Sequence, residues 1–342
     1  MIEKICREVE RRIGRKVRER DIESILMAAA EEVDVWELIA LSDVAQNVVE
    51  EALKVLKGKG LIKFNGKVRL TEAGKKIVKD RGFRDWRCKH CNGRGVEVFH
   101  DIAEEFFKIV RSRPRAVREF DQGYVVPEVT LARVAHMDMH GDVRGRRIII
   151  LGDDDLVSIA LGLTGLPKEI VVVEIDRRLN DFIEKTAREY GFEVEFLHFD
   201  LRNPLPHHLA GRFDTFECDP TETLPGLKMF VGRGIAAVRE GGAGYFGLTR
   251  IESDLWRWYE AQRIILELGA VITDIIPKFN WYENWDYYRE TVGWQRMPES
   301  LKVPPKALWY NSAWYRVEVL KKKGWNGRIE GDPYTDELSS TV

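Results

Sequence analysis

The sequence predicts an α/β fold, in which a small winged-helix-like α+β domain precedes a Rossmann-like seven-stranded domain. Two observations predict this architecture. From about residue 147 onward, short apolar segments alternate with amphipathic segments of helical spacing, a pattern typical of a parallel sheet that helices cover on both faces. Before these segments, residues 21–80 combine helical patterns with one hairpin signal, which indicates a separate α+β unit.

Composition narrows the class of protein. The chain has 342 residues, 44% of them apolar, and a formal net charge of −2, so we expect two or three domains and no global attraction to nucleic acid or membrane. A charge-rich segment follows Met1, no run has the length of a membrane span, and four scattered cysteines form no disulfide framework, which predicts a cytoplasmic protein. We divide the chain into 1–82 (winged-helix-like), 83–118 (linker with a Cys-x-x-Cys turn and a helix) and 119–342 (Rossmann-like, with an aromatic insertion and a C-terminal tail).

The first domain has the element order of a winged helix. Ser42-Asp43 is expected to cap a helix that ends near Gly58, and the turn Asn65-Gly66 joins two short strands before Thr71 caps another helix. A recognition helix could dock on nucleic acid, helped by Lys54, Lys57, Lys59 and Lys63. We favour the alternative, a packing or dimerisation module with a solvated basic face, because fold class does not determine function.

The linker contains Cys88 and Cys91, two residues apart in the manner of half a zinc ribbon. A closed structural zinc site needs four ligands, and the sequence has no second pair. His90, His100 or the same pair from another subunit could complete the site. We expect no metal and interpret the segment as a turn with two reduced thiols.

The elements of the third domain follow from apolar periodicity. Helical spacing through Ile102, Phe106, Phe107 and Val110 leads into it. Strands are predicted at 147–151, 169–174, 194–199, 213–218, 244–248, 271–276 and 315–320, with helices after Asp155 and over 177–190, 229–238 and 253–268. A last pair of strands joined by a long aromatic insertion indicates the seven-stranded class shared by methyltransferases and aminopropyltransferases.

Acids at the ends of the second and third strands predict a nucleoside site. In a doubly wound sheet, an acid about twenty residues past the first turn binds the ribose hydroxyls. Glu174 lies 22 residues after Gly152, and Asp176 follows it. Asp200, with Leu201 next to it, ends the third strand where adenine would lie. Each acid alone is also explained as a helix cap or surface charge, but three together indicate a nucleoside.

Three carboxylates follow the first strand, in Gly152-Asp153-Asp154-Asp155. A phosphate needs backbone amides that several glycines bring close, and only one glycine is present here. Each carboxylate about 4 Å from a phosphate charge would cost on the order of 4 kcal/mol at an effective dielectric constant of about 20. The loop therefore disfavours NAD and ATP and favours a cationic nucleoside, such as a sulfonium with an amine tail. Helix N-termini also prefer aspartate, but one residue would satisfy that preference.

The fourth strand ends in a second acidic cluster, Cys218-Asp219-Pro220-Thr221-Glu222. In this class of fold, the acid there faces the atom that receives the transferred group. Carboxylates from strands one and four can hold a polycation and take its proton as it attacks. Cys218 is interpreted as a buried filler and not as a nucleophile.

An aromatic tract, residues 279–288, is expected between the last two strands. Its rings and interspersed acids suit alkylammonium groups through cation–π attraction. A subunit interface would use the same residues, so both interpretations stay open.

These residues resemble those of the branched-chain polyamine synthases, also called bis(aminopropyl)spermidine synthases. The resemblance covers nearly the whole chain and rests on Phe120-Asp121-Gln122, Tyr124, Pro127-Glu128 and the segments 152–156, 213–216 and 230–236. It implies the transfer of two aminopropyl groups to the central secondary amine of spermidine, from decarboxylated S-adenosylmethionine as donor co-substrate and with no other cofactor. It also implies methylthioadenosine as the second product, and a homodimer in a thermophile.

The resemblance implies roles for individual residues. Asp154 would accept the proton of the attacking amine, with Asp219 as the second catalytic carboxylate, while Asp153 and Asp155 would hold ammonium groups. The implied donor-binding residues are Gly152, Asp153, Glu174, Asp176, Asp200 and Leu201, and the implied polyamine-binding residues are Tyr124, Asp155 and Glu222. Two positions depart from the family pattern: Glu174 replaces a frequent Asp, and Thr221 replaces the second proline of Asp-Pro-Pro-Glu.

Two alternatives belong to other classes. A methyltransferase that uses S-adenosylmethionine on RNA or protein would receive its target from the winged-helix part and would bind nucleic acid in a salt-sensitive way. A transcription regulator would sense a polyamine or nucleoside and form no product. We favour the aminopropyltransferase and expect no nucleic-acid or membrane partner.

Overall fold

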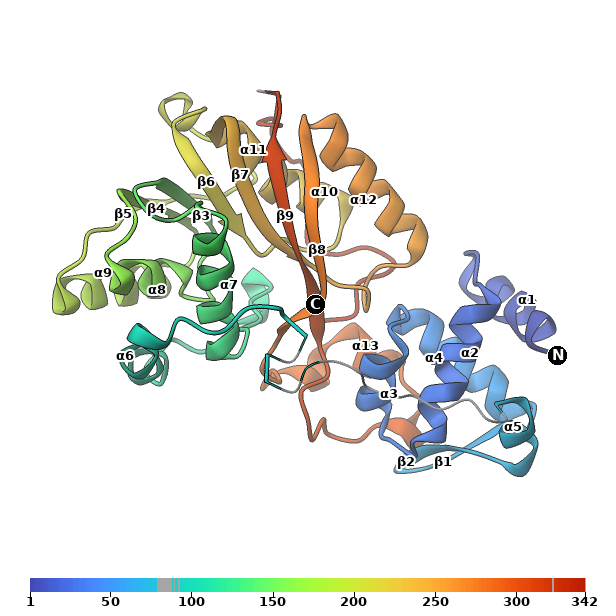
Figure 1. The fold of residues 1–342 in the computed structure, drawn as a ribbon. Helices are drawn as coiled ribbons and strands as arrows, with labels where there is room; N and C mark the ends of the chain where they lie inside the picture. Colours follow the sequence, from blue (N-terminus) through green and yellow to red (C-terminus); the bar gives the residue numbers. More distant parts are fainter. Residues whose placement is uncertain (79–87, 89, 92, 322, 342) are drawn as a thin grey trace.

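The structure of the chain is a computed structural model that describes residues 1–78, 88, 90–91, 93–321 and 323–341. Figure 1 shows a central twisted sheet with helices on both faces and, beside one end of it, a group of helices with a two-stranded hairpin. Within the described residues the large sheet has seven strands, so the predicted α/β class is confirmed.

The large sheet has the strand order β5-β4-β3-β6-β7-β9-β8, and β9 runs antiparallel to both of its neighbours. Its strands are β3 (Arg147–Leu151), β4 (Glu169–Glu174), β5 (Glu195–His198), β6 (Phe213–Cys218), β7 (Val238–Leu248), β8 (Ala270–Trp281) and β9 (Asn311–Val319). The chain moves outward from β3 to β5 and then returns to β6. The order therefore reverses between β3 and β6, where doubly wound folds bind their ligands.

Alternate residues of the strands face two different layers of helices. Ile148 and Ile150 belong to one buried cluster, and Ile149 and Leu151 belong to the other, because successive side chains of a strand point to opposite faces. The helices of the first layer are α6 (His100–Val110), α7 (Pro127–Met139), α8 (Val157–Thr164) and α9 (Arg177–Tyr190). The second layer contains α10 (Leu224–Leu227), the π turn η3 (Lys228–Gly232), α11 (Arg233–Ala237) and α12 (Leu255–Glu267).

The N-terminal part consists of helices and a hairpin: α1 (Ile2–Ile13), α2 (Glu19–Ala30), α3 (Val35–Ser42), α4 (Gln46–Gly58), β1 (Ile62–Asn65), β2 (Lys67–Leu70) and α5 (Glu72–Ile77). The predicted hairpin is confirmed, and so is the Thr71 cap, whose hydroxyl accepts the Gly74 amide N–H at 3.2 Å. The winged-helix assignment and the three domain ranges stay predictions. The boundary at residues 82 and 83 lies outside the described residues.

Two local predictions in this part were wrong. Ser42 and Asp43 end α3, because Asp43 has a left-handed φ of 54°, and α4 begins only at Gln46. The hairpin turn centres on Gly66, which has a φ of 70°, with Asn65 opposite Lys67. The loop therefore contains one unpaired residue, Gly66, whereas the sequence predicted a two-residue Asn-Gly loop.

The N-terminal helices pack on the insertion between β8 and β9. The Trp36 ring of α3 stacks on Trp294 with 6.2 Å between centroids and lies 4.4 Å from Trp309, and its indole N–H donates to the Val303 carbonyl at 2.7 Å. Trp294 belongs to α13 (Val292–Arg296). The aromatic tract was placed wholly inside this insertion, but its first three residues, 279–281, form the end of β8.

Other expectations concern the linker and the membrane. Cys88 is exposed, Cys91 is partly exposed, and neither forms a disulfide, while Lys89 and Asn92 lie outside the described residues. In the described part of the chain, no three Cys, His, Asp or Glu side chains gather as they would around a metal ion, and the absence of a metal stays a prediction. None of the helices described is both long and apolar enough to cross a bilayer.

Candidate active site

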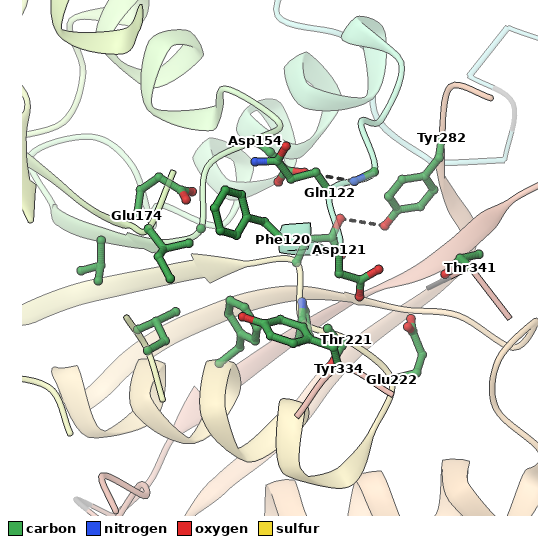
Figure 2. Close-up of a pocket in the computed structure, with 18 of the residues that line it drawn as sticks. Phe120, Asp121, Gln122, Asp154, Glu174, Thr221, Glu222, Tyr282, Tyr334 and Thr341 are labelled. Atoms are coloured by element: carbon green, nitrogen blue, oxygen red, sulfur yellow. Dashed lines mark hydrogen bonds between the residues drawn. The ribbon is translucent and has the colours of Figure 1, made fainter. Parts of the chain in front are cut away.

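A pocket opens at the carboxyl ends of β3, β4 and β6, where the strand order reverses (Figure 2). The loops after these strands form part of its wall. The segment after the 3-10 turn η1 (Arg118–Phe120), the aromatic insertion and the C-terminal tail complete it. Segments far apart in the sequence thus meet at the place where the acidic motifs were predicted to act.

The loop after β3 contributes one of its three carboxylates to the pocket. Gly152 has a φ of 78°, a left-handed conformation that favours glycine, and it turns the chain so that Asp154 faces the pocket. The Asp154 carboxylate accepts a hydrogen bond from the Gly123 amide at 3.2 Å (Figure 2). Asp154 therefore lies where the sequence placed the proton acceptor.

Asp153 and Asp155 lie behind the pocket wall. Both are buried and neither lines the pocket. The Asp153 carboxylate accepts the Ser158 amide N–H at 3.3 Å, near the start of α8. Asp155 accepts the Val125 amide N–H at 2.7 Å and pairs with the Arg133 guanidinium at 2.8 Å. The structure does not support ammonium-binding roles for these two carboxylates, because protein groups already occupy them.

Glu174, at the end of β4, lines the side of the pocket where the nucleoside was expected. Its carboxylate accepts the amide N–H groups of Asp153 at 2.9 Å and Asp176 at 2.7 Å, which fixes its orientation. Leu201 also lines this side. The predicted pair Gly152 and Glu174 is thus brought together around one cavity.

The other two predicted nucleoside acids have protein partners and do not line the pocket. The Asp176 carboxylate binds the Arg178 guanidinium at 2.6 Å and accepts the Gln122 amide N–H at 2.9 Å. Asp200 pairs with Arg202 at 2.7 Å. Both carboxylates therefore form contacts within the protein beside the pocket, and neither faces its cavity.

The segment after β6 supplies two further carboxylates, Asp219 and Glu222, as predicted from the strand-four cluster. Asp219 Oδ2 accepts hydrogen bonds from Arg133 Nη2 at 2.8 Å and from the Tyr282 hydroxyl at 2.7 Å. A side-chain Cβ at Gly247 would lie 2.4 Å from Asp219 Oδ1, so only glycine leaves room for the carboxylate. Cys218, just before it, is fully buried, and burial raises the pKa of its thiol, which agrees with a filler.

Three of the carboxylates that line the pocket, Asp154, Asp121 and Glu222, hold protons more tightly than exposed carboxylates do. Burial raises the pKa of Asp154 well above its usual range, and the neighbouring charges of Asp155, Glu174 and Asp219 raise it further. Burial likewise raises the pKa of Asp121 and of Glu222. A cationic ligand would relieve this repulsion, so the pocket is suited to positive charge.

Several lining residues received no role from the sequence. Asp121 lies in the motif Phe120-Asp121-Gln122 and has a left-handed φ of 51°, which no local pattern indicated. Tyr334 and Thr341 come from the C-terminal tail and gave no signal. The hydroxyl of Tyr124, in contrast, donates to the Pro114 carbonyl outside this pocket.

Known proteins are similar to this chain over most or all of its length. Residues 101–341 match the family described as the branched-chain polyamine synthase A C-terminal domain. The N(4)-bis(aminopropyl)spermidine synthase of Thermococcus kodakarensis is 46% identical over 98% of this chain and 100% of that protein. The synthase of the same name from Methanocaldococcus jannaschii is 41% identical over 100% of both chains.

A solved structure is similar over the same length. The crystal structure of the branched-chain polyamine synthase from Thermus thermophilus, in complex with N4-aminopropylspermidine and 5′-methylthioadenosine, has a TM-score of 0.94 to this chain. The two sequences are 39% identical, and the alignment covers 100% of this chain and 98% of that one. The family match, the full-length relatives and the shared structure together show that this chain belongs to the branched-chain polyamine synthases.

Proposed function

We propose that this protein is an aminopropyltransferase, which moves aminopropyl groups from decarboxylated S-adenosylmethionine to the central secondary amine of spermidine. The products are a branched polyamine and methylthioadenosine. One observation carries the proposal. The carboxylates of Asp121, Asp154, Glu174, Asp219 and Glu222 face one pocket, and no Lys, Arg or His is found among its described lining residues. A cavity lined in this way attracts a sulfonium nucleoside and a polyamine.

Glu174 binds the ribose hydroxyls of the donor in this proposal. Its carboxylate is fixed by the amides of Asp153 and Asp176, so these two residues serve the donor indirectly. Gly152 and Leu201 line the same side and leave a surface for the flat nucleoside. Asp200 orders the Leu201 loop through its ion pair with Arg202.

The acceptor lies between the acidic loops. Asp154 takes the proton, Asp219 faces the reacting amine from the end of the adjacent strand β6, and Glu222 and Asp121 hold the terminal ammonium groups. The rings of Tyr282, Trp285 and Tyr310 line the same side of the pocket and suit alkylammonium groups through cation–π attraction. Tyr124 and Asp155 act from outside the pocket, because they flank and anchor the segment that carries the Gly123 amide.

The first transfer is a direct displacement. The lone pair of the secondary amine attacks the propyl carbon bonded to the sulfonium sulfur. As the C–N bond forms, the C–S bond breaks and its electron pair returns to sulfur, which leaves neutral methylthioadenosine. The amine proton passes to Asp154, whose raised pKa makes it a better base than an exposed aspartate.

The second transfer differs in its charge balance. The acceptor is now a tertiary amine, which must lose any bound proton before it attacks, and the product is a quaternary ammonium with a permanent positive charge. No proton leaves during this displacement. The carboxylates of Asp154 and Asp219 therefore counter the new charge, which is stabilised in a site of low effective dielectric.

One experiment tests the function against its alternatives. The purified protein is incubated with spermidine and either decarboxylated S-adenosylmethionine or S-adenosylmethionine, and products are weighed by mass spectrometry. We expect gains of one and two aminopropyl units, with methylthioadenosine, only with the decarboxylated donor. Methylated product would indicate the methyltransferase, and binding of spermidine without any product would indicate the regulator.

We also propose that the protein is a homodimer. Helix α12 exposes Leu255, Trp256, Tyr259 and Leu266, with 42%, 65%, 56% and 57% of their surface accessible. An apolar row of this kind is typical of a surface that a partner covers. Light scattering would report twice the chain mass, and the cytoplasmic location stays an expectation for cell fractionation.

A further inference from the structure

One buried arginine joins the two acidic walls of the pocket. Arg133 lies on α7 and is fully buried. Its Nη1 donates to Asp155 at 2.8 Å and to Glu217 at 3.1 Å, and its Nη2 donates to Asp219 at 2.8 Å. Asp155 follows β3 and Asp219 follows β6, so one guanidinium links the ends of two adjacent strands.

The guanidinium is held on its other sides as well. Arg133 Nε donates to Asn280 Oδ1 at 2.9 Å, and Asn280 in turn donates to the Ser312 hydroxyl at 2.8 Å. The guanidinium carbon lies 4.7 Å from the centre of the Trp314 ring. A planar fork with several donors can satisfy all of these groups, whereas a lysine ammonium cannot take the same geometry.

The network also reaches the proton acceptor through the backbone. Asp155 Oδ2 binds Arg133, and its Oδ1 accepts the Val125 amide N–H at 2.7 Å. Two residues earlier, the Gly123 amide donates to Asp154 at 3.2 Å. The guanidinium thus anchors the segment from which Asp154 receives its hydrogen bond.

A cation at this point changes the titration of every group around it. The ionisable groups that face Arg133 are Asp155, Glu217, Asp219 and Tyr282. Burial raises the pKa of Asp155 to about 6 and that of Glu217 well above its usual range, and in both cases Arg133 opposes the shift. Beyond these groups, Asp154 responds to Asp155, Glu174, Asp219 and Arg113.

We propose that Arg133 is a positioning residue for the transfer reaction, which fixes the carboxylates of Asp155 and Asp219 in place and so holds Asp154 and Asp219 toward the attacking amine. Burying a charge is costly, and an apolar side chain would pack α7 on the sheet without that cost. The arginine is therefore explained by the carboxylates that it orders. This inference rests on the proposed function, because it assigns a role within that reaction.

The test compares Arg133→Met and Arg133→Lys with a matched control, Arg316→Met. Arg316 is also buried, pairs with Asp142 at 3.0 Å and donates to the Tyr245 hydroxyl at 2.9 Å. None of these three residues lines the pocket. For each protein, kcat/KM for spermidine is measured against pH with the decarboxylated donor in excess, and the Tm is recorded at each pH.

Arg133→Met is expected to lower kcat/KM roughly 100-fold or more, because the reacting carboxylates lose their fixed positions. In its plot of kcat/KM against pH, the midpoint of the acidic limb should move up by about one to three pH units. Without the cation Asp155 and Glu217 keep their protons to a higher pH. A protonated Asp155 binds the Val125 amide more weakly, which loosens the segment that orders Asp154. Arg133→Lys should lower kcat but leave the acidic limb of the pH profile near that of the wild type. Lysine keeps the positive charge but lacks the planar set of N–H donors.

Arg316→Met should lower the Tm and leave the acidic limb where it is. The proposal is overturned if all proteins share one acidic limb, or if Arg316→Met moves the limb as far as Arg133→Met does. Where Arg133→Met does not fold, Arg133→Gln replaces it, and a wild-type kcat in Arg133→Lys also overturns the proposal.

A wild-type protein that forms no product would refute the proposed function instead. The contacts of Arg133 with its carboxylate partners are then tested by the Tm of the two proteins alone. Below about pH 5 the Asp155 carboxyl is largely protonated in both proteins, since its pKa is about 6 in the wild type. The difference in Tm between wild type and Arg133→Met should therefore widen as the pH rises through 6, and a constant difference would contradict the proposal.

Discussion

At the scale of the residue, the three consecutive aspartates after β3 have three different environments. Asp153 binds the start of α8, Asp155 pairs with Arg133, and only Asp154 faces the pocket. Identical side chains therefore differ in pKa and in access to substrate. The family resemblance predicts the middle one as the base and the outer two as ammonium ligands, and the sequence does not reveal the partners of the outer two, because these partners lie elsewhere in the chain.

Asp154→Asn is expected to reduce turnover by about 10²- to 10⁴-fold, because an amide cannot accept the amine proton. The fold should survive, since asparagine has nearly the same shape as aspartate and the surrounding carboxylates already disfavour a negative charge at this position. Product formation from spermidine is measured by mass spectrometry, and the Tm is measured by thermal unfolding. The Tm should be unchanged or slightly raised.

Asp181→Asn is the matched control, since Asp181 is an exposed carboxylate on α9, outside the pocket. It should keep wild-type turnover. Activity of Asp154→Asn within a few-fold of wild type would remove Asp154 from the role of base.

At the scale of the element, the first four strands of the large sheet along the chain were predicted closely and the last three were not. The bounds of β3, β4 and β6 match their predicted ranges, because β3 and β4 have continuous apolar centres and β6 carries Phe213, Phe216 and Cys218 in a short segment between loops. β8 was expected over 271–276 but extends to Trp281. Its extra residues pair with Asn311 and Ser312 of β9, and the long insertion between the strands hides that pairing from local sequence patterns.

The C-terminal tail is an element whose place depends on one carboxylate. Glu252 follows β7 and is 4% exposed. Its Oε1 accepts the Thr341 amide N–H at 2.6 Å and the Thr341 hydroxyl at 3.0 Å, and it also accepts the Ser340 amide N–H at 2.5 Å. Because Thr341 lines the pocket, Glu252 fixes the position of one wall of the candidate site.

Glu252→Ala is expected to release this tail. Each lost hydrogen bond to a charged group contributes about 1.5–3 kcal/mol, so amide exchange at Ser340 and Thr341 should accelerate at least about tenfold. Hydrogen–deuterium exchange with mass spectrometry of the C-terminal peptide measures the change, and KM for spermidine should rise with it.

Glu267→Ala is the control, because Glu267 is exposed at the end of α12 and pairs only with nearby Arg263 in the described structure. The exchange of the C-terminal peptide should not change in this variant. Equal exchange in Glu252→Ala and wild type would show that Glu252 does not hold the tail.

At the scale of the whole molecule, the N-terminal helices and the sheet share one buried cluster. This cluster includes Ile5 of α1, Trp36 of α3 and Trp314 of β9. Trp36 stands at the junction, between Trp294 and Trp309 of the insertion. We therefore expect the chain to unfold in one cooperative transition, although its sequence divides into three ranges.

Trp36→Ala tests this coupling. Loss of the large buried ring should lower the free energy of unfolding by about 3–5 kcal/mol, measured by urea denaturation with far-ultraviolet circular dichroism. The control is Trp256→Ala, because Trp256 is 65% exposed and its removal should change stability far less. Two separate transitions in the wild type, with only the first shifted by Trp36→Ala, would contradict the coupling.

The sequence by itself determined the α/β class, the central strands, the acidic loop after β3 and the family, because apolar periodicity and short motifs are local properties of the chain. The tertiary structure alone decided which carboxylates face the pocket, and it added Asp121, Arg133 and Thr341 to the account. Arg133 and Asp219 are 86 residues apart, and Glu252 and Thr341 are 89 apart. Contacts at such separations depend on how strands and loops pack, and no spacing in the sequence encodes them.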